Sequence, residues 1–172
     1  EAADSVHEVV RAAFGARPVL DPPADALGDD ADALARALGH RGGLLATLDG
    51  EPVGCLVLHP GSDGLFLRRF GVHPRAQGRG VAGALVEAAV RSGVGHGALV
   101  VLARQELPET VAFWERHGFV ESGRRPPYVE LRRALPTSHR VEDAEQMQRL
   151  GADVGASLRA GDLVVLTGEL GA

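Results

Sequence analysis

The stretch Arg75-Ala76-Gln77-Gly78-Arg79-Gly80 decides which fold this sequence is assigned to. It follows an apolar run that predicts a strand over about 65–72, and it precedes a helical pattern over 81–92. Gly78 and Gly80 let the backbone approach a ligand closely and adopt positive φ. Successive free N–H groups at a helix N-terminus bind anionic oxygens, and a pyrophosphate is the natural occupant of such a site. On these residues alone, a simple tight turn explains the two glycines equally well.

The segments around this loop predict a mixed order of helices and strands. Helical spacing of apolar residues predicts helices at about residues 4–14, 30–38, 81–92, 108–117 and 142–159. Apolar or alternating runs predict strands at about residues 43–48, 52–58, 65–72, 98–103, 119–124, 128–133 and 163–167. Asp49-Gly50 is a strong hairpin signal, and Gly39 and Gly118 are expected to end helices. Three successive antiparallel strands argue against a doubly wound fold and favour an α/β domain with a mixed (α+β) sheet over 1–135.

The composition excludes several classes of function. The chain has 172 residues and a net charge of −5, which argues against general binding of nucleic acids or membrane surfaces because these need a basic face. All 18 basic residues are arginine, so the chain contains no catalytic, Schiff-base or Walker-motif lysine. Cys55 is the single cysteine and lies in an apolar run, which favours a buried thiol over a nucleophile. No apolar stretch is long enough for a membrane span and no signal peptide is visible, so a reducing cytoplasmic setting is expected.

Three motifs, in order along residues 4–134, resemble the acyl-CoA-dependent N-acetyltransferases of the GNAT superfamily. Residues 75–80 match that family's R/Q-x-x-G-x-G/A pyrophosphate loop, Phe70-Gly71-Val72-His73-Pro74 resembles its strand end, and Ala112–Phe119 resembles its A-F-Y-E-x-x-G-F signature. The resemblance implies a GNAT-type fold, in which central strands of a mixed sheet splay apart around acetyl-CoA (CoA after transfer). The family begins with a strand before its first helix, whereas only three residues precede Asp4 here. Either that strand lies outside this fragment, or the sheet edge is made in another way.

The resemblance also implies which residues contact the cofactor. The backbone of Phe70, Gly71 and Val72 is expected along the pantetheine arm and the acyl carbonyl. The pyrophosphate is expected to bind the backbone N–H groups of Gln77, Gly78, Arg79, Gly80, Val81 and Ala82. The side chains of Arg75 and Arg79 are expected to add positive charge around it. Trp114 stands where the family often has a tyrosine that acts as an acid. Because indole cannot donate a proton at usable pH, we expect Trp114 to pack against the cofactor or the core.

The implied reaction is direct attack of a neutral amine on the thioester within one ternary complex. An aliphatic amine has a pKa of about 10, so a base is required. The family's usual glutamate has no counterpart, since residues 65–72 contain no carboxylate. The candidate catalytic residues are Glu106, Glu109 and Tyr128; the alternatives are solvated acids at a helix start and an ordinary sheet residue. The histidines lack metal-ligand spacing, so no metal is expected.

Residues 136–172 exceed what this fold needs and predict a helix–strand extension. Gly168-Glu169-Leu170-Gly171-Ala172 fits the first five positions of a Walker A loop, G-x-x-x-x-G-K-[ST]. The longer stretch 151–172 resembles the start of the P-loop ATPase subunit of the machinery that makes threonylcarbamoyladenosine on tRNA. A family-specific extension of the acetyltransferase is the alternative. In either case the apolar residues are expected to pack on the first domain or on a second copy of the chain, as a homodimer.

Three functions are compatible with these features. The first is an N-acyltransferase acting on a small-molecule amine or a protein N-terminus, with no direct contact to nucleic acid or membrane. The second is a non-catalytic module that binds acyl-CoA and regulates the attached ATPase, which Trp114 and the missing carboxylate favour. The third is a structural remnant that binds nothing. The residues identify neither the acceptor nor the length of the acyl chain.

Overall fold

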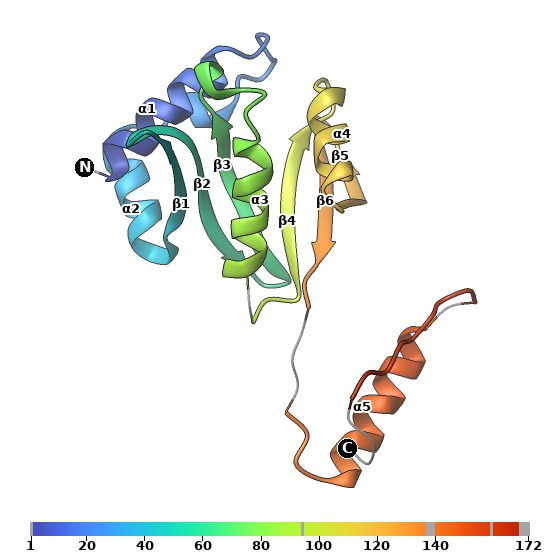
Figure 1. Cartoon of the computed structure of the whole chain (residues 1–172). Coiled ribbons are helices and arrows are strands. Elements are labelled where there is room, and N and C mark those ends of the chain that lie inside the picture. Colours follow the sequence, from blue (N-terminus) through green and yellow to red (C-terminus); the bar gives the residue numbers. More distant parts are fainter. Residues whose placement is uncertain (1, 94, 137–139, 159, 169–172) are drawn as a thin grey trace. The chain divides into compact units, whose positions relative to one another are not determined.

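The computed structural model describes residues 2–93, 95–136, 140–158 and 160–168 (Figure 1). The chain divides into two compact units, Glu1–Thr137 and Ser138–Ala172. The first unit contains a six-stranded sheet with helices on both faces. Among its described residues, the second contains one helix, and the positions of the two units relative to each other are not determined.

The sheet of the first unit is mixed, as predicted. Its strand order is β1-β2-β3-β4-β6-β5, and the strands span Gly43–Leu48 (β1), Glu51–Gly61 (β2), Gly64–Val72 (β3), Ala98–Arg104 (β4), Val120–Arg125 (β5) and Tyr128–Ala134 (β6). All neighbours are antiparallel except β3 and β4, which are parallel. The β1–β2 hairpin turns at Asp49 and Gly50, with φ of 53° and 84°. These positive values are what the Asp-Gly signal predicts.

The two central strands separate soon after they meet. β3 and β4 pair only through Leu65 with Leu99 and Phe66 with Val100. β4 remains paired with β6 over its whole length, so the opening lies between β3 and β4. Residues 67–72 of β3 therefore have no strand partner on the β4 side. Figure 1 shows the two strands diverging toward the end of the unit that carries α1 and the N-terminus of α3.

A bulge in β3 lies at this opening. Cys55 of β2 pairs with Gly71 and Val57 pairs with Arg68, so two residues of β3 stand opposite a single residue of β2. Arg69, one of these two, has a φ of 54°, in the left-handed region that non-glycine residues rarely adopt. Bulges bend a strand and re-aim its side chains, and they are frequent near functional sites. The bulge therefore makes the open part of β3 a candidate for the functional site.

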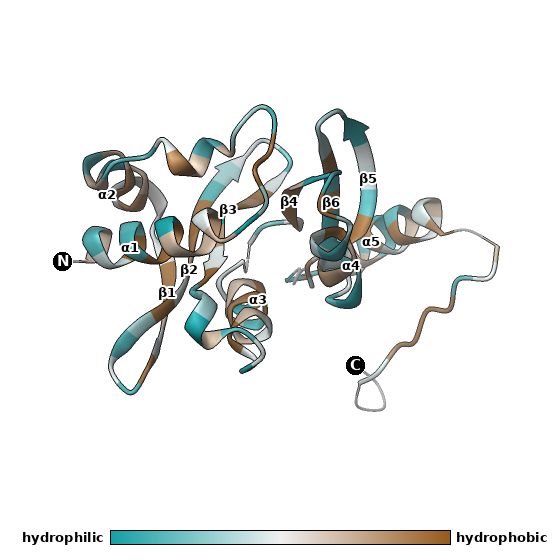
Figure 2. Ribbon diagram, turned by 90° about the horizontal axis from the view of Figure 1, so that it is seen from above, coloured by the Kyte–Doolittle hydropathy of each residue, from teal (hydrophilic) through white to brown (hydrophobic). Residues whose placement is uncertain are grey.

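Helices cover both faces of the sheet. Ala2–Gly15 (α1) and Ala31–Arg41 (α2) lie on one face, and Val81–Ser92 (α3) and Pro108–Arg116 (α4) lie on the other (Figure 2). Asp30 caps α2, since its Oδ1 accepts a hydrogen bond from Ala33 N–H at 2.7 Å. The prediction that Gly39 ends this helix is wrong. The helix continues to Arg41, because Gly42, with a φ of 77°, supplies the left-handed residue at its end.

The core of the first unit is mainly aliphatic, as the low aromatic content predicts. Its largest fully buried side chains are leucines and valines: Leu34, Leu56, Leu99, Leu131, Val9, Val10, Val86, Val100 and Val129. α1 contributes the buried face Val6, Val9, Val10 and Ala13, which matches its helical spacing. Gly71 allows α1 to come this close, because a Cβ there would lie 2.8 Å from the Cβ of Ala13. The first helix is thus fixed against the open strand.

The second unit differs from its sequence-based prediction. The helix Ala144–Ser157 (α5) is present and Asp143 caps it, accepting from Gln146 N–H at 2.7 Å. The strand predicted over 163–167 is not formed, and the correction has a physical reason: a lone strand needs a hydrogen-bonding partner. Leu163, Val165 and Leu166 are exposed. Of the Walker-like residues, 169–172 lie outside the described part of the chain, and packing of this unit on another surface stays a prediction.

No helix within the described ranges is long and apolar enough to span a membrane.

Candidate functional site

The loop before α3 has the geometry of an anion site. A 3-10 turn, Pro74–Ala76 (η2), leads into Gly78 and Gly80, whose φ values are 73° and 78°. Gly80 is the N-cap of α3 and offers no side chain to cap it. Across the residues that the structure describes, no acceptor takes the N–H groups of 78–83, whereas Ala84 N–H bonds to the Gly80 carbonyl at 3.0 Å. The free donors and the positive end of the helix dipole together favour a bound phosphate.

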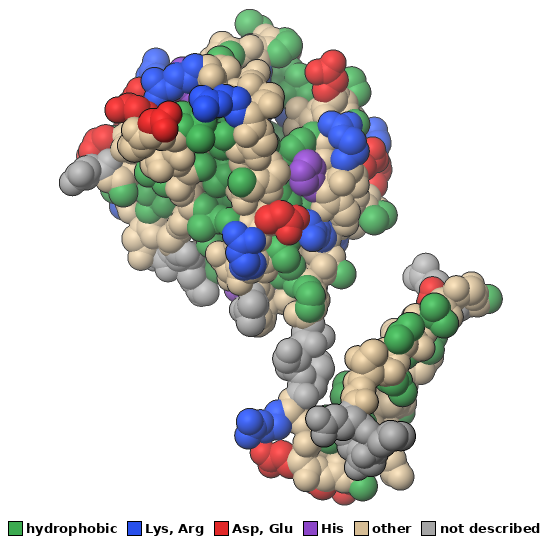
Figure 3. All heavy atoms as spheres, in the orientation of Figure 1, with side chains coloured by type: hydrophobic (Ala, Val, Ile, Leu, Met, Phe, Trp, Pro, Cys, Tyr) green, Lys and Arg blue, Asp and Glu red, His purple; other side chains and the backbone are tan. Residues whose placement is uncertain are grey.

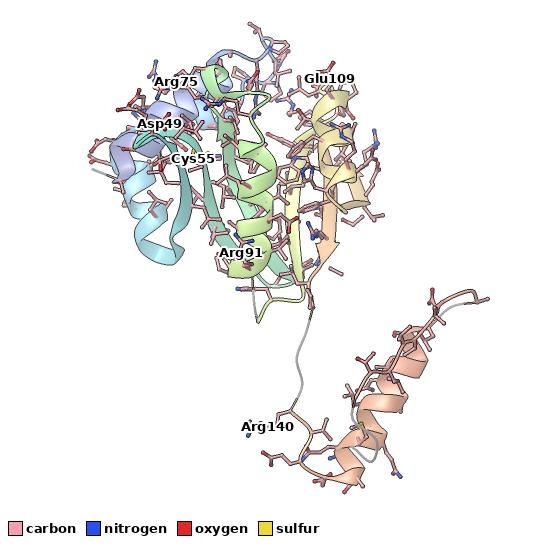
Figure 4. All side chains as sticks on the ribbon, in the orientation of Figure 1. Asp49, Cys55, Arg75, Arg91, Glu109 and Arg140 are labelled. Carbon is pink, nitrogen blue, oxygen red and sulfur yellow. The ribbon has the colours of Figure 1, made fainter. Side chains whose placement is uncertain are left out.

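The two arginines of this loop are arranged differently. The Arg75 guanidinium donates to the Pro52 carbonyl at 3.1 Å and lies 3.8 Å from the Glu51 carboxylate. It therefore ties the loop to the start of β2 instead of standing free for an anion. Arg79 is exposed. Figure 4 shows Arg75 at the same end of the unit as Glu109, across the gap between the central strands, with Arg91 at the other end of α3.

A pocket of about 610 Å³, called the larger pocket, opens beside this loop. It lies between β3 and the start of α4, and its walls include residues of all three predicted motifs: Phe70, Gly71, Val72, Gln77, Ala82, Phe113 and Trp114. Glu106 and Glu109 also line it, and so does Arg17. Arg75, Gly78, Arg79, Gly80 and Val81 do not line it, and Val81 is buried in the core. The pocket thus unites the open edge of β3 with the first turn of α3.

Trp114 closes the floor of this pocket. It is only 4% exposed and lies in an aromatic cluster, with ring centroids 4.7 Å from Phe70, 5.1 Å from Phe113 and 5.0 Å from Phe119. These edge-to-face contacts join β3 to α4 across the gap between the central strands. The packing role expected for Trp114 agrees with this position. The indole also lines a second pocket, which lies between β3 and β4.

The second pocket, called the smaller pocket, has a volume of about 190 Å³. It is bounded by β3, by β4 and by the segment between α1 and α2; its lining includes Arg17, Leu20, Asp25, Leu67, Arg68, Arg69, Phe70, Arg104, Leu107, Trp114 and Tyr128. Arg17, Phe70 and Trp114 border both pockets. The two pockets are therefore neighbours that meet where the sheet opens.

Glu106 is held by a buried arginine and is poorly suited to act as a base. Arg104 is 6% exposed, and its Nη2 and Nε donate to the two carboxylate oxygens of Glu106 at 2.8 and 3.2 Å. The same guanidinium donates to the carbonyls of Asp21 and Pro22 at 2.9 and 2.7 Å. The hydrogen bonds from Arg104 lower the pKa of Glu106, which weakens it as a proton acceptor. Its role in this structure is to complete the bonding of Arg104.

The other two catalytic candidates line different pockets. Glu109, in the first turn of α4, lines the larger pocket and is exposed. No ion pair engages it within the part of the chain that the structure describes. Tyr128, at the start of β6, lines the smaller pocket, with the Arg104 guanidinium 5.6 Å from its ring centroid. The structure thus separates the three candidates into an engaged carboxylate, an available carboxylate and a phenol that lines the other pocket.

Sequence reasoning missed the charged residues of the smaller pocket. Arg17 and Asp25 come from the segment after α1, and Arg68 and Arg69 come from the bulged strand. Two adjacent arginines in an otherwise apolar strand were a visible signal in the sequence. Arg17 and Asp25 carried no such signal, because only the fold brings their segment against β3.

Cys55 is structural. Its side chain is fully buried, and its Sγ lies 3.6 Å from the Arg69 carbonyl and 3.9 Å from the Val6 carbonyl. Burial raises the pKa of this thiol to about 12, so it is protonated at neutral pH. This agrees with the sequence-based expectation of a buried thiol.

Within the described ranges no cluster of three or more histidine, cysteine or carboxylate side chains has a geometry suited to a metal ion. Figure 3 shows one face of the first unit, on which arginines and acidic side chains are interspersed and form no continuous basic patch.

A mixed sheet that opens between two parallel strands, beside an uncapped helix N-terminus, is an arrangement suited to an elongated anionic ligand. Residues 5–119 match the acetyltransferase (GNAT) family, and the chain belongs to this family. The predicted fold class and the N-acetyltransferase assignment are thereby confirmed at the level of the family, which uses acetyl-CoA. The comparison with curated proteins found no match.

Similar solved structures support the same fold. PH1933 from Pyrococcus horikoshii OT3 superimposes with a TM-score of 0.65 at 13% identity, covering 78% of this chain and 91% of the other. The ribosomal-protein-S18-alanine N-acetyltransferase from Escherichia coli has a TM-score of 0.62 at 22% identity, with 82% and 91% covered. A PaiA N-acetyltransferase from Thermoplasma acidophilum, solved in complex with coenzyme A, has a TM-score of 0.61 at 11% identity, with 77% and 92% covered. At these identities the likeness establishes the fold alone.

Proposed function

We propose that this protein transfers an acetyl group from acetyl-CoA to a primary amine by direct attack within a ternary complex. The observation that carries the proposal is the larger pocket, which borders the open edge of β3 and also Gln77 and Ala82, the residues that flank the free N–H groups before α3. In this proposal the pyrophosphate lies on the N–H groups of 78–82. The pantetheine arm runs along Phe70, Gly71 and Val72 toward the meeting point of the two pockets.

The chemical step balances without a metal. The amine nitrogen attacks the thioester carbonyl carbon, so a C–N bond forms and the carbonyl oxygen becomes an oxyanion. The C–S bond then breaks, and coenzyme A leaves as a thiolate that takes a proton from water. Unpaired backbone groups of β3 orient the carbonyl, and positioning supplies most of the rate.

We assign Glu109 as the base that accepts the proton of the attacking amine, through a water molecule. Glu109 borders the larger pocket, and no arginine engages it in the described ranges. Glu106 borders the same pocket but has a lowered pKa and is bonded to Arg104. The assignment therefore rests on availability: of the two carboxylates, only Glu109 has free oxygens.

Two measurements test the proposal. Calorimetry with acetyl-CoA is expected to give saturable binding, and thiol release across a panel of primary amines is expected to depend on both protein and amine. Absence of acetyl-CoA binding contradicts the cofactor site. Saturable binding without turnover on any amine contradicts the transferase and supports the second candidate below.

The second candidate is a non-catalytic acyl-CoA-binding module that regulates an attached tRNA-modification ATPase. It is favoured by Trp114, which fills the position of the family's usual acid and is buried in packing. The resemblance of 151–172 to a P-loop ATPase supports the attachment, and codons for Gly-Lys-Ser/Thr directly after Ala172 are the expected continuation. Any other codons there contradict the attachment. A cytoplasmic location and a homodimer belong to both candidates as proposals.

A further inference from the structure

The smaller pocket lies in the opening between β3 and β4, since residues of both strands line it. It meets the larger pocket at Arg17, Phe70 and Trp114. If acetyl-CoA occupies the larger pocket, the smaller pocket is the adjoining space from which an amine can reach the thioester. This step rests on the proposed function.

The charge of the smaller pocket is strongly biased. Four arginines line it, namely Arg17, Arg68, Arg69 and Arg104, against a single acid, Asp25. The whole chain has a net charge of −5, so this concentration of positive charge is local. A pocket lined by one sign of charge favours ligands of the opposite sign.

Two of the four arginines are occupied by the protein itself. The Arg69 guanidinium binds both carboxylate oxygens of Asp29: its Nε donates to Oδ2, and its Nη2 donates to Oδ1 at 3.0 Å. Arg104 binds Glu106 and the carbonyls of the segment before η1 (Asp25–Leu27), as described above. These two side chains hold the wall of the pocket in place and have little capacity left for a ligand.

The other two arginines keep free donors. Arg17 stacks on the Phe14 ring at 3.8 Å and donates from Nη2 to the Phe70 carbonyl at 3.2 Å. No carboxylate neutralises it among the described residues. Burial lowers the pKa of Arg17, but a guanidinium remains protonated in proteins. Arg68 is exposed, and the structure gives its guanidinium neither an ion pair nor a hydrogen bond in the ranges it describes. An anion between Arg17 and Arg68 gains charge-assisted hydrogen bonds without displacing an existing partner.

The size of the pocket restricts the ligand. Pockets for drug-sized ligands measure roughly 300–1,000 Å³, whereas this one measures about 190 Å³. Beyond the arginines its walls are mostly apolar, with Leu67, Leu107 and Trp114 among them, and Asp25, Thr110 and Tyr128 add polar groups. These dimensions suit a molecule the size of an amino acid, with a short apolar body and one anionic group.

We infer that the acceptor is a small amine that carries a carboxylate a few atoms from its nitrogen, such as a free amino acid, and that Arg17 and Arg68 bind this carboxylate. The amine then points to the opening beside Phe70, where the thioester lies. A phosphate on a small amine has similar chemistry, so the test includes it as a separate arm. A peptide N-terminus lacks the nearby carboxylate and is expected to be a poor acceptor.

The test compares matched acceptors at saturating acetyl-CoA. Alanine, leucine and glutamate are each assayed beside their carboxamides, with phosphoethanolamine and a leucine-initiated peptide as further arms. At least one free amino acid is expected to have a kcat/KM about 10- to 100-fold above that of its carboxamide, the size of a charge-assisted hydrogen bond. Carboxamides or peptides that react as well as the acids overturn the inference, and so does a preference for phosphoethanolamine.

Variants locate the effect in the pocket. Arg68→Gln, at an exposed position, is expected to raise the KM of the preferred amino acid about tenfold or more, with little change for its carboxamide. Arg17→Gln is expected to do the same with an additional loss in kcat, because Arg17 also touches Phe70. Arg91→Gln is the matched control, since Arg91 is exposed at the far end of α3 (Figure 4). An unchanged KM in Arg68→Gln overturns the inference.

Failure of the proposed function gives a different result. If acetyl-CoA binds but no amine reacts, calorimetry with N-acetyl-leucine and N-acetyl-leucinamide on the CoA-saturated protein examines the pocket without catalysis. Preference for the acid, lost in Arg68→Gln, supports the carboxylate site even then. Equal binding of the two, or binding of neither, overturns it.

Discussion

The two neighbouring pockets at the opening of the sheet are built from different parts of the chain. The larger pocket follows a strand edge without a partner, and beside it lie an uncapped helix start and two glycines at positive φ, which are all features of the backbone. The smaller pocket depends on side chains, and chiefly on arginines from three separate segments. A backbone site recognises what a whole family shares, whereas a side-chain site can change by single substitutions. We therefore expect the fold to determine which cofactor is bound, and a few side chains to determine which acceptor is bound.

Trp114 borders both pockets, and its removal is expected to have the largest effect. Trp114→Ala deletes a buried ring that contacts Phe70, Phe113 and Phe119. The free energy of unfolding is expected to fall by about 3–5 kcal/mol, measured by urea denaturation. Trp114→Phe keeps much of the packing and is expected to lose less than half of that. A loss below about 1 kcal/mol for the alanine variant contradicts the packing role.

The two carboxylates of the larger pocket offer the next contrast. Glu109→Gln is expected to lower kcat by about 100-fold, because the proposed proton acceptor is lost. Glu106→Gln is expected to change kcat less than about threefold, since Arg104 already holds the pKa of Glu106 down. Steady-state thiol release at pH 7 measures both. If Glu106→Gln proves the slower enzyme, the assignment of the base is wrong.

A substitution of Gly80 tests the proposed pyrophosphate site, which is made of backbone groups, separately from the smaller pocket, which is made of side chains. Gly80→Val places a β-branched residue at a φ of 78°, and the strain displaces the first turn of α3. Binding of acetyl-CoA, measured by calorimetry, is expected to weaken about tenfold. Acetyl-pantetheine lacks the pyrophosphate, so its binding is expected to change little. Gly97→Val, at a glycine of ordinary φ with open space around it, is the matched control.

The smallest expected effect concerns Cys55, which touches neither pocket. Its pKa is raised from 9.0 to about 12 in the folded protein, so the unfolded chain loses the proton first as pH rises. The stabilisation is complete below pH 9 and is lost progressively toward pH 12. At pH 9.5 the loss is expected to be less than about 1 kcal/mol, and Cys55→Ala is expected to lack this component. Rapid labelling of the native thiol at pH 8 contradicts its burial.

The larger pocket could be predicted from the sequence better than the smaller one, because its backbone features follow from local patterns whereas the smaller pocket depends on side chains from distant segments. The strand, the glycine loop and helix α3 follow from local patterns, so residues 65–92 were predicted nearly to the residue. The engagement of Arg75 by Pro52 and of Glu106 by Arg104 depends on contacts far apart or around a turn, which no periodicity reveals. The strand expected over 163–167 shows the opposite error: apolar residues alone predicted an element that has no partner to pair with. The sequence therefore predicts local geometry well, but it does not predict pairing between distant residues.

The segment between α1 and α2 ties together the two halves of a sheet that do not bond to each other at that point. Arg69 of β3 holds it at Asp29, and Arg104 of β4 holds it at Asp21 and Pro22. The segment therefore bridges β3 and β4 where the sheet is open. If the smaller pocket binds the acceptor, as proposed, insertions or deletions in this segment are expected to change the choice of acceptor and to leave the cofactor loop unaltered.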